Sequence, residues 1–261
     1  MSKKAKRRQK QKQKRESGLE KVFFDAAASG DIDTVRQCIE EQGQKVDAKK
    51  AASELHPECM TPLLLACKHG RLKMVKFLVE DASADSDATD TNGCTALMIA
   101  CLCGYRDIAS FLLDNGSANA VHARASADGK TALMFACERG HAAIARLLVE
   151  KGADVNAGDE RGSTALIAAS IMGHLDTVKF LVEDAGADVN VTDADGDSAL
   201  AQSGGNGHED VASFLLAHGA TKDFFVSALL GDLEAVTKAV EEDGQVGRQS
   251  GPCRACHSPL S

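Results

Sequence analysis

The feature that most constrains the fold is a pattern that returns about every 34 residues. Five hydroxyl-bearing residues each open a short apolar segment, and they are separated by 34, 36, 33 and 34 residues. They are Thr61, Thr95, Thr131, Thr164 and Ser198. A glycine follows each one at a fixed interval, at Gly70, Gly104, Gly140, Gly173 and Gly207. Two independent markers that share one period indicate an array of helical repeats, in which each unit packs on its neighbours.

Residues 131–162 show what one unit is expected to form. The Thr131 hydroxyl can accept a hydrogen bond from a free amide at the start of a short helix. Gly140 can end that helix, because glycine enters the left-handed region without a steric penalty. Apolar residues over 144–148 have helical spacing and predict a second helix. The Asp, Asn and Gly residues of 152–162 favour a tight hairpin turn.

These motifs resemble the ankyrin repeat family over about residues 19–245. The resemblance rests on Thr-Pro-Leu at 61–63, Thr-Ala-Leu at 95–97, 131–133 and 164–166, and Gly-Ala-Asp-Val-Asn at 152–156 and 186–190. It implies an all-α ankyrin-repeat solenoid of stacked helix-turn-helix units with short β-hairpin loops. The chain departs from the family at one position, where the family's histidine is replaced by Leu64, Met98, Met134, Ile167 and Ala201. Apolar contacts are therefore expected to contribute more to the stacking.

We divide the chain on this basis into a repeat domain and two tails. Residues 1–18 are expected to be a basic disordered tail, residues 19–245 the ankyrin repeat domain, and residues 246–261 a disordered tail that contains C-x-x-C-H. The repeat domain is expected to contain an N-terminal cap at 19–55, full repeats near 56–89, 90–125, 126–158, 159–192 and 193–221, and a terminal partial repeat at 222–245.

Charge is distributed unevenly along the chain. The net charge is −8, yet residues 1–21 hold ten Lys/Arg and only two Asp/Glu, so the rest of the chain is acidic. The basic run at 1–17 is consistent with a nuclear-import signal, with a contact to nucleic acid or an acidic partner, or with a solvated tail. It contains no aromatic residue that could stack on bases, which weakens the nucleic-acid interpretation.

The sequence also predicts the compartment. No run approaches the roughly 18 apolar residues of a membrane span, so we expect no membrane insertion. Cys67, Cys101 and Cys137 occupy one repeat position, which is typical of small buried side chains and not of a disulfide framework. We therefore expect a reducing compartment, the cytoplasm or the nucleus. We also expect the protein to be a monomer.

The family resemblance also implies a set of partner-binding residues. In an ankyrin stack, the hairpin tips and the two positions before each helix-ending glycine face the concave groove. Here the helix positions include Lys68, His69, Leu102, Cys103, Glu138, Arg139, Ile171 and Met172, and the hairpin positions include Thr91, Asn92, Lys130, Glu160, Arg161 and Asp195. Leu102/Cys103 and Ile171/Met172 are apolar where exposure is expected, which favours a protein-binding patch. The alternative is that the stack shields them.

One short motif suggests different chemistry. Cys253, Cys256 and His257 form a C-x-x-C-H string near the end of the chain. Its spacing suits half of a tetrahedral zinc site, but no second pair follows, so we predict no metal and regard these three residues as weak candidates. The same string attaches haem in other proteins, although the sequence shows no export signal. The alternative is a pair of cysteines in a flexible tail.

The sequence therefore predicts a scaffold or adaptor and not an enzyme. We find no phosphate-binding loop, no nucleophile elbow and no paired acids outside the repeat register, and we expect no catalytic residues and no cofactor. The expected function is binding of a protein partner in the groove of a rigid array, which loses little ordering entropy on binding. Two alternatives remain: a nuclear or nucleic-acid-associated adaptor that uses the basic tail, and a truncated ankyrin and zinc-finger regulator.

Overall fold

The computed structural model describes residues 21–42, 60–116 and 120–221. The chain divides into two compact units, and the boundary runs through the middle of the repeat domain. Among the described residues, unit 1 comprises 21–42, 60–116, 120–136 and 143–154, and unit 2 comprises 137–142 and 155–221. The sequence expectations for residues 1–18, 43–55, 222–245 and 246–261 concern residues that lie wholly outside the described ranges.

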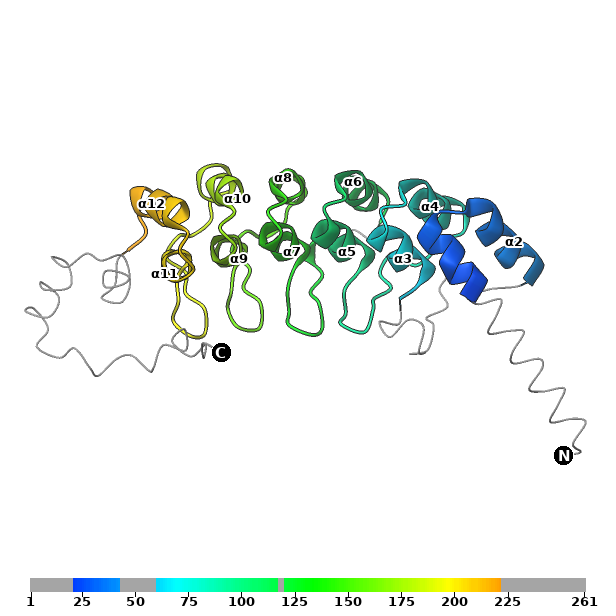
Figure 1. Ribbon diagram of the computed structural model, residues 1–261, viewed down its shortest axis with the longest axis horizontal. Coiled ribbons are helices and arrows are strands. Elements are labelled where there is room, and N and C mark those ends of the chain that lie inside the picture. The colour runs from blue at the N-terminus through cyan, green and yellow to red at the C-terminus, as the bar shows by residue number, and fades with distance from the viewer. Residues whose placement is uncertain (1–20, 43–59, 117–119, 222–261) are drawn as a thin grey trace, which may run out of the picture. The chain divides into compact units, whose positions relative to one another are not determined.

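Unit 1 consists of antiparallel helix pairs in two layers (Figure 1). Residues 21–29 are helical and are followed by α2 (Ile32–Gln42), α3 (Pro62–Lys68), α4 (Leu72–Lys76), η1 (Phe77–Asp81), α5 (Ala96–Cys103), α6 (Arg106–Asn115) and η2 (Ala120–His122). α7 (Ala132–Glu138) and α8 (Ala142–Glu150) lie mostly in this unit. The helices that open successive repeats, α3 and α5, pack on each other, and α4 packs on α6 in the second layer.

Unit 2 repeats the same arrangement. It contains α9 (Ala165–Ile171), α10 (Leu175–Lys179), η3 (Phe180–Asp184), α11 (Ala199–Gly205) and α12 (Glu209–Ala217). α9 packs on α11 in one layer and α10 on α12 in the other, so each unit buries its apolar side chains between neighbouring repeats. α11 extends to Gly205, although glycine is unfavourable inside a helix and the last two residues of α11 are Gly204 and Gly205.

The repeat markers have the roles that the sequence predicts. Each opening hydroxyl lies at the N-cap of a helix and accepts a hydrogen bond from the backbone amide three residues later, at distances of 3.2 to 3.4 Å. Each of the five marker glycines has a positive φ, between 69° and 81°. The hydroxyl satisfies a free amide at the start of the helix, and the glycine lets the chain reverse direction at its end. Each involves only a few neighbouring residues, which is why the sequence reveals both.

Methionine takes part in the capping where the family's histidine is missing. The thioether sulfur of Met98 accepts from the Thr95 amide at 3.5 Å, and that of Met134 accepts from the Thr131 amide at 3.4 Å. Both methionines are buried. A thioether is a weak acceptor, so this position combines apolar packing with a modest hydrogen bond.

The repeats differ from one another at the ends of their second helices. The sequence Phe-Leu-Val-Glu-Asp forms a π-helical turn both at η1 and at η3, whereas α8 remains α-helical to Glu150. A π-turn accommodates one extra residue in a helix. The chain then turns at Ser83 (φ 55°) after η1 and at Gly186 (φ 73°) after η3.

Candidate functional site

The hairpin loops are built on aspartates whose carboxylates hold the turn. Asp90 Oδ1 accepts from the amides of Asn92 and Cys94, at 2.8 and 2.9 Å. Asp159 and Asp193 make the same pair of bonds to the amides two and four residues later, at 2.9 to 3.0 Å. These aspartates therefore stabilise turns, as expected for side chains that bond to nearby backbone amides. Isolated antiparallel bridges close three of the loops, Thr89 to Thr95, Arg124 to Thr131 and Thr192 to Ser198.

Within each unit, neighbouring loops are joined by a backbone hydrogen bond. In unit 1 the Ala127 amide donates to the Asn92 carbonyl at 3.0 Å, and in unit 2 the Ala194 amide donates to the Arg161 carbonyl at 2.7 Å. The carbonyl groups of Asn92 and Arg161, two of the predicted hairpin residues, are therefore held in place by a hydrogen bond from the next repeat. The tips form an ordered edge, which suits a surface that must present side chains without further ordering.

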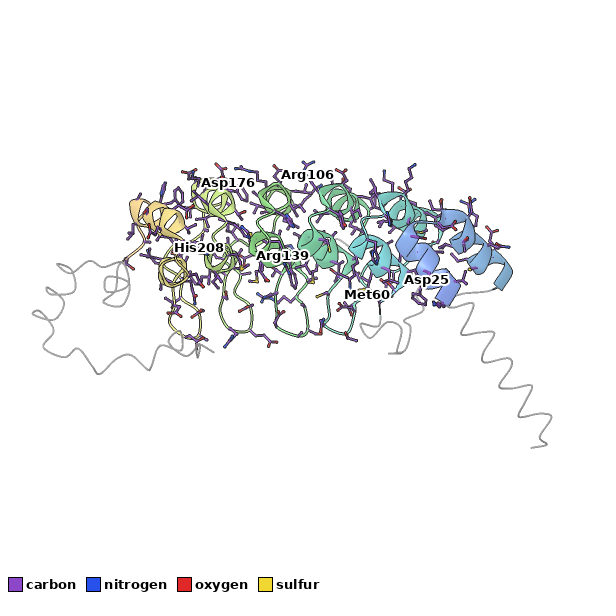
Figure 2. The ribbon with its side chains drawn as sticks, in the orientation of Figure 1. Asp25, Met60, Arg106, Arg139, Asp176 and His208 are labelled. Atoms are coloured by element: carbon purple, nitrogen blue, oxygen red, sulfur yellow. The ribbon has the colours of Figure 1, made fainter. Side chains whose placement is uncertain are left out.

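The ends of the first helices of the repeats are anchored by histidines in unit 2. His174 Nε2 lies 3.1 Å from the Glu138 carbonyl oxygen, and His208 Nε2 lies 3.0 Å from the Ile171 carbonyl oxygen. Figure 2 labels His208 between α11 and the neighbouring α9. Each histidine therefore ties its repeat to the preceding one, and its recurrence reflects the framework and not a metal site.

The predicted partner-binding residues of unit 1 differ in exposure. Lys68, His69, Thr91 and Asn92 are exposed, and Leu102, Cys103 and Lys130 are half-buried. Lys130 lies 3.7 Å from an Asp128 carboxylate oxygen and 5.8 Å from the centre of the Phe135 ring, so its ammonium already has two favourable neighbours.

The predicted residues of unit 2 are mostly exposed. Arg139, Glu160, Arg161, Met172 and Asp195 are exposed, and Glu138 and Ile171 are half-buried. Met172 is 48% exposed, a large fraction for an apolar side chain. Arg161 Nη2 lies 3.8 Å from Asp195 Oδ2, and this exposed pair joins two neighbouring hairpin tips.

Two exposed apolar residues were not among the predicted sites. Val22 is 47% exposed on the first helical segment, and Tyr105 is 37% exposed at the start of α6. The Tyr105 ring packs over Gly70 of the preceding repeat, where an added Cβ would lie 2.6 Å from it. Tyr105 therefore has a packing role, which the repeat register signals because it directly follows the marker glycine Gly104.

The potential metal ligands and the thiols of the described residues do not form a recognisable metal site. Among them, no group of three or more His, Cys, Asp or Glu side chains is placed to hold a metal ion. Burial and the nearby Asp90 carboxylate raise the pKa of the Cys94 thiol to about 11, so it is a poor nucleophile at neutral pH. Burial also raises the pKa of Cys67 and Cys137. Cys253, Cys256 and His257 lie outside the described residues.

None of the helices that the structure describes is long and apolar enough to cross a membrane.

The stacked helix pairs, the capped first helices and the hairpin edge are those of an ankyrin array, and the sequence comparison agrees. The sequence matches the family described as Ankyrin repeats (3 copies) over residues 23–122 and 116–193. The chain belongs to the ankyrin repeat family and is an all-α ankyrin solenoid.

Similar curated proteins include regulatory subunits. The chain is 35% identical over 97 residues to protein phosphatase 1 regulatory subunit 27 of Mus musculus, and 34% identical over 96 residues to its Homo sapiens counterpart. Each match covers 37% of this chain and 58% of the other protein, so the chain spans somewhat more than half the length of these relatives. It is also 33% identical over 103 residues to ankyrin repeat and SAM domain-containing protein 6 of Mus musculus, which is 39% of this chain and 11% of that protein. The repeats and the regulatory-subunit relatives support a role as a protein-interaction adaptor.

Proposed function

We propose that the chain is a non-enzymatic adaptor that binds a protein partner through the hairpin tips and the adjoining ends of the first helices of its repeats. The observation that carries the proposal is the exposure of Met172 at the end of α9, the helix that opens its repeat, in a unit whose hairpin tips are ordered by hydrogen bonds. An exposed apolar side chain beside charged groups is typical of a residue that becomes buried in an interface.

Charge adds specificity to this surface. The predicted positions of unit 2 combine acidic and basic side chains, Glu160, Arg161 and Asp195 at the tips and Arg139 at a helix end. The Arg161–Asp195 pair is exposed on both sides, at 75% and 69%, so it contributes little to the stability of the fold. These groups are therefore available to pair with a partner and to set the orientation in which it binds.

The relatives suggest one partner to test first. Protein phosphatase 1 appears in the names of two similar proteins, and we propose it as a candidate partner of this chain. We also propose that the protein works in the reducing cytoplasm or nucleus, because Cys67 and Cys137 are fully buried at one repeat position, as small apolar side chains are.

The test compares two equally exposed apolar residues. Met172→Asp is expected to reduce partner capture at least about tenfold, because it removes an apolar contact and buries a carboxylate in the interface. Val22→Asp is the matched control, since Val22 has nearly the same exposure, 47% against 48%, but lies outside the predicted surface. Capture is measured by pull-down and proximity labelling, with purified protein phosphatase 1 as one defined probe. If Met172→Asp is folded and captures the partner as well as the wild type does, the proposed surface is refuted.

A further inference from the structure

A cleft in unit 1 is lined by residues that do not belong to the surface described above. It opens between α2 and η1 and has a volume of about 320 Å³. Its lining consists of Arg36, Ile39, Glu40, Phe77, Asp81 and Ala82. Phe77 is buried, Ile39 and Ala82 are half-buried, and the three charged residues are exposed. The cleft thus combines an apolar base with a charged rim.

The chemistry of the cleft suits long basic side chains. The face of the Phe77 ring already attracts a cation, because the Arg36 guanidinium carbon lies 5.2 Å from the ring centre. Glu40 and Asp81 provide two carboxylates, and neither forms an ion pair within the part of the chain that the structure describes. Lys and Arg side chains lay their methylene groups along apolar surface while their charged ends reach polar groups. An apolar base with two carboxylates at its rim therefore fits them.

A basic segment precedes, in the sequence, the helix pair that forms one side of this cleft. The helical residues 21–29 and α2 form an antiparallel pair joined by a turn at Gly30, which has φ 90° (Figure 1). In such a pair the start of the first helix lies beside the end of the second. Residue 21, to which the preceding segment is attached, therefore lies at the same end of the pair as Glu40.

The length of chain is sufficient to reach the cleft. α2 has 11 residues, which corresponds to about 16 Å. The six residues that lead from Arg15 to Lys21 can span up to about 20 Å when extended. Basic side chains near Arg15 can therefore reach any point along α2.

We propose that this cleft binds the basic segment at residues 3–15 of the same chain. The segment has nine Lys/Arg and no Asp or Glu, so its charge complements the rim, where the two carboxylates outweigh the single guanidinium of Arg36. When the segment is docked, its cations are shielded from other acidic molecules. The cleft and any acidic partner then compete for the same basic side chains of the tail, and the strength of the cleft contact sets how readily the tail is released.

Zero-length cross-linking of the full chain tests this contact. A water-soluble carbodiimide joins a lysine amine to a carboxylate only where the two touch. We expect cross-links from Lys10, Lys12 or Lys14 to Glu40 or Asp81, identified by mass spectrometry. About 0.5 M NaCl should reduce them severalfold, because it shortens the screening length to roughly 4 Å. Cross-links spread evenly over carboxylates elsewhere, or the absence of cross-links from the tail, would overturn the proposal.

A pair of matched variants makes the test specific. Glu40→Gln should reduce the remaining cross-link from the tail to Asp81 about fivefold, because it removes one of the two attracting charges. Glu80→Gln is the control, since Glu80 is exposed beside Asp81 in the same π-turn but does not line the cleft. An equal loss in both variants would show a general charge effect and contradict the proposal.

Isotope labelling separates the two possible sources of the tail. In a mixture of ¹⁵N-labelled and unlabelled chains, cross-links within one chain support the proposal, whereas cross-links between chains would show that a second copy supplies the segment. Met172 does not line the cleft, so partner capture and tail cross-linking can fail independently.

Discussion

Two buried threonines in unit 2 should respond in opposite ways to the same substitution. Thr177 is 1% exposed on α10, and its hydroxyl oxygen has no hydrogen-bond partner. Thr164 is 2% exposed at the N-cap of α9, and its hydroxyl accepts from the Ile167 amide at 3.4 Å. Replacing each threonine by valine exchanges the hydroxyl for a methyl group with almost no change in shape.

The expected magnitudes follow from these two environments. Burying a hydroxyl without a partner costs roughly 1–3 kcal/mol in proteins, so Thr177→Val should increase the free energy of unfolding by about 1 kcal/mol. The equivalent position in the next repeat is already a valine, Val211, which is fully buried. Thr164→Val removes a helix cap and should lower the free energy of unfolding by about 1 kcal/mol. The two variants should therefore differ by about 2 kcal/mol.

Urea denaturation followed by far-ultraviolet circular dichroism measures this difference. The single tyrosine lies in unit 1, so the helical signal is the better probe of unit 2. The transitions must also be compared for slope, because a repeat array can lose cooperativity when one unit is weakened. A lower stability for both variants would refute the argument, since it would show that the Thr177 hydroxyl is satisfied in solution.

Two further substitutions test the backbone turns and the stacking between repeats. Gly173→Ala should destabilise the protein by at least about 2 kcal/mol in urea denaturation, because φ is 71° and the new Cβ would lie 2.4 Å from His208 Nδ1. Gly186→Ala, with φ 73° and no atom within 4 Å of the new Cβ, should cost only about 1 kcal/mol, and equal effects would contradict the role of the histidine. Ser83→Gly should raise the free energy of unfolding by about 0.5 kcal/mol, because Ser83 adopts φ 55°, which glycine adopts without strain. A lower thermal midpoint for Ser83→Gly would show that the serine side chain outweighs the backbone strain.

Local chemistry explains which parts of the fold could be predicted from the sequence. The capping of α9 by Thr164 and the turn at Gly173 each need only the few residues around them. The same is true of Asp193, whose carboxylate bonds to amides two and four residues later. Interactions of this range recur from unit to unit, so the period of the sequence reports them directly.

The contacts between repeats depend on residues that are far apart in the sequence. His208 lies 37 residues from the Ile171 carbonyl that it meets, and the methionine that replaces the family's histidine at Met98 turned out to offer its sulfur to the Thr95 amide. The sequence shows that these positions recur but not which atoms they touch. That information comes from the stacking of the repeats.

The candidate surface also has features that the sequence predicts and features that only the stacking of the repeats decides. By itself the sequence determined the repeat fold, the capped helices and the positions of the hairpin tips, because each follows from local hydrogen bonding and backbone geometry. The tertiary structure alone decided that Met172 is exposed while the adjacent Ile171 is half-buried. Successive residues on a helix point about 100° apart, so adjacent side chains at a helix end differ in exposure according to how the repeats stack.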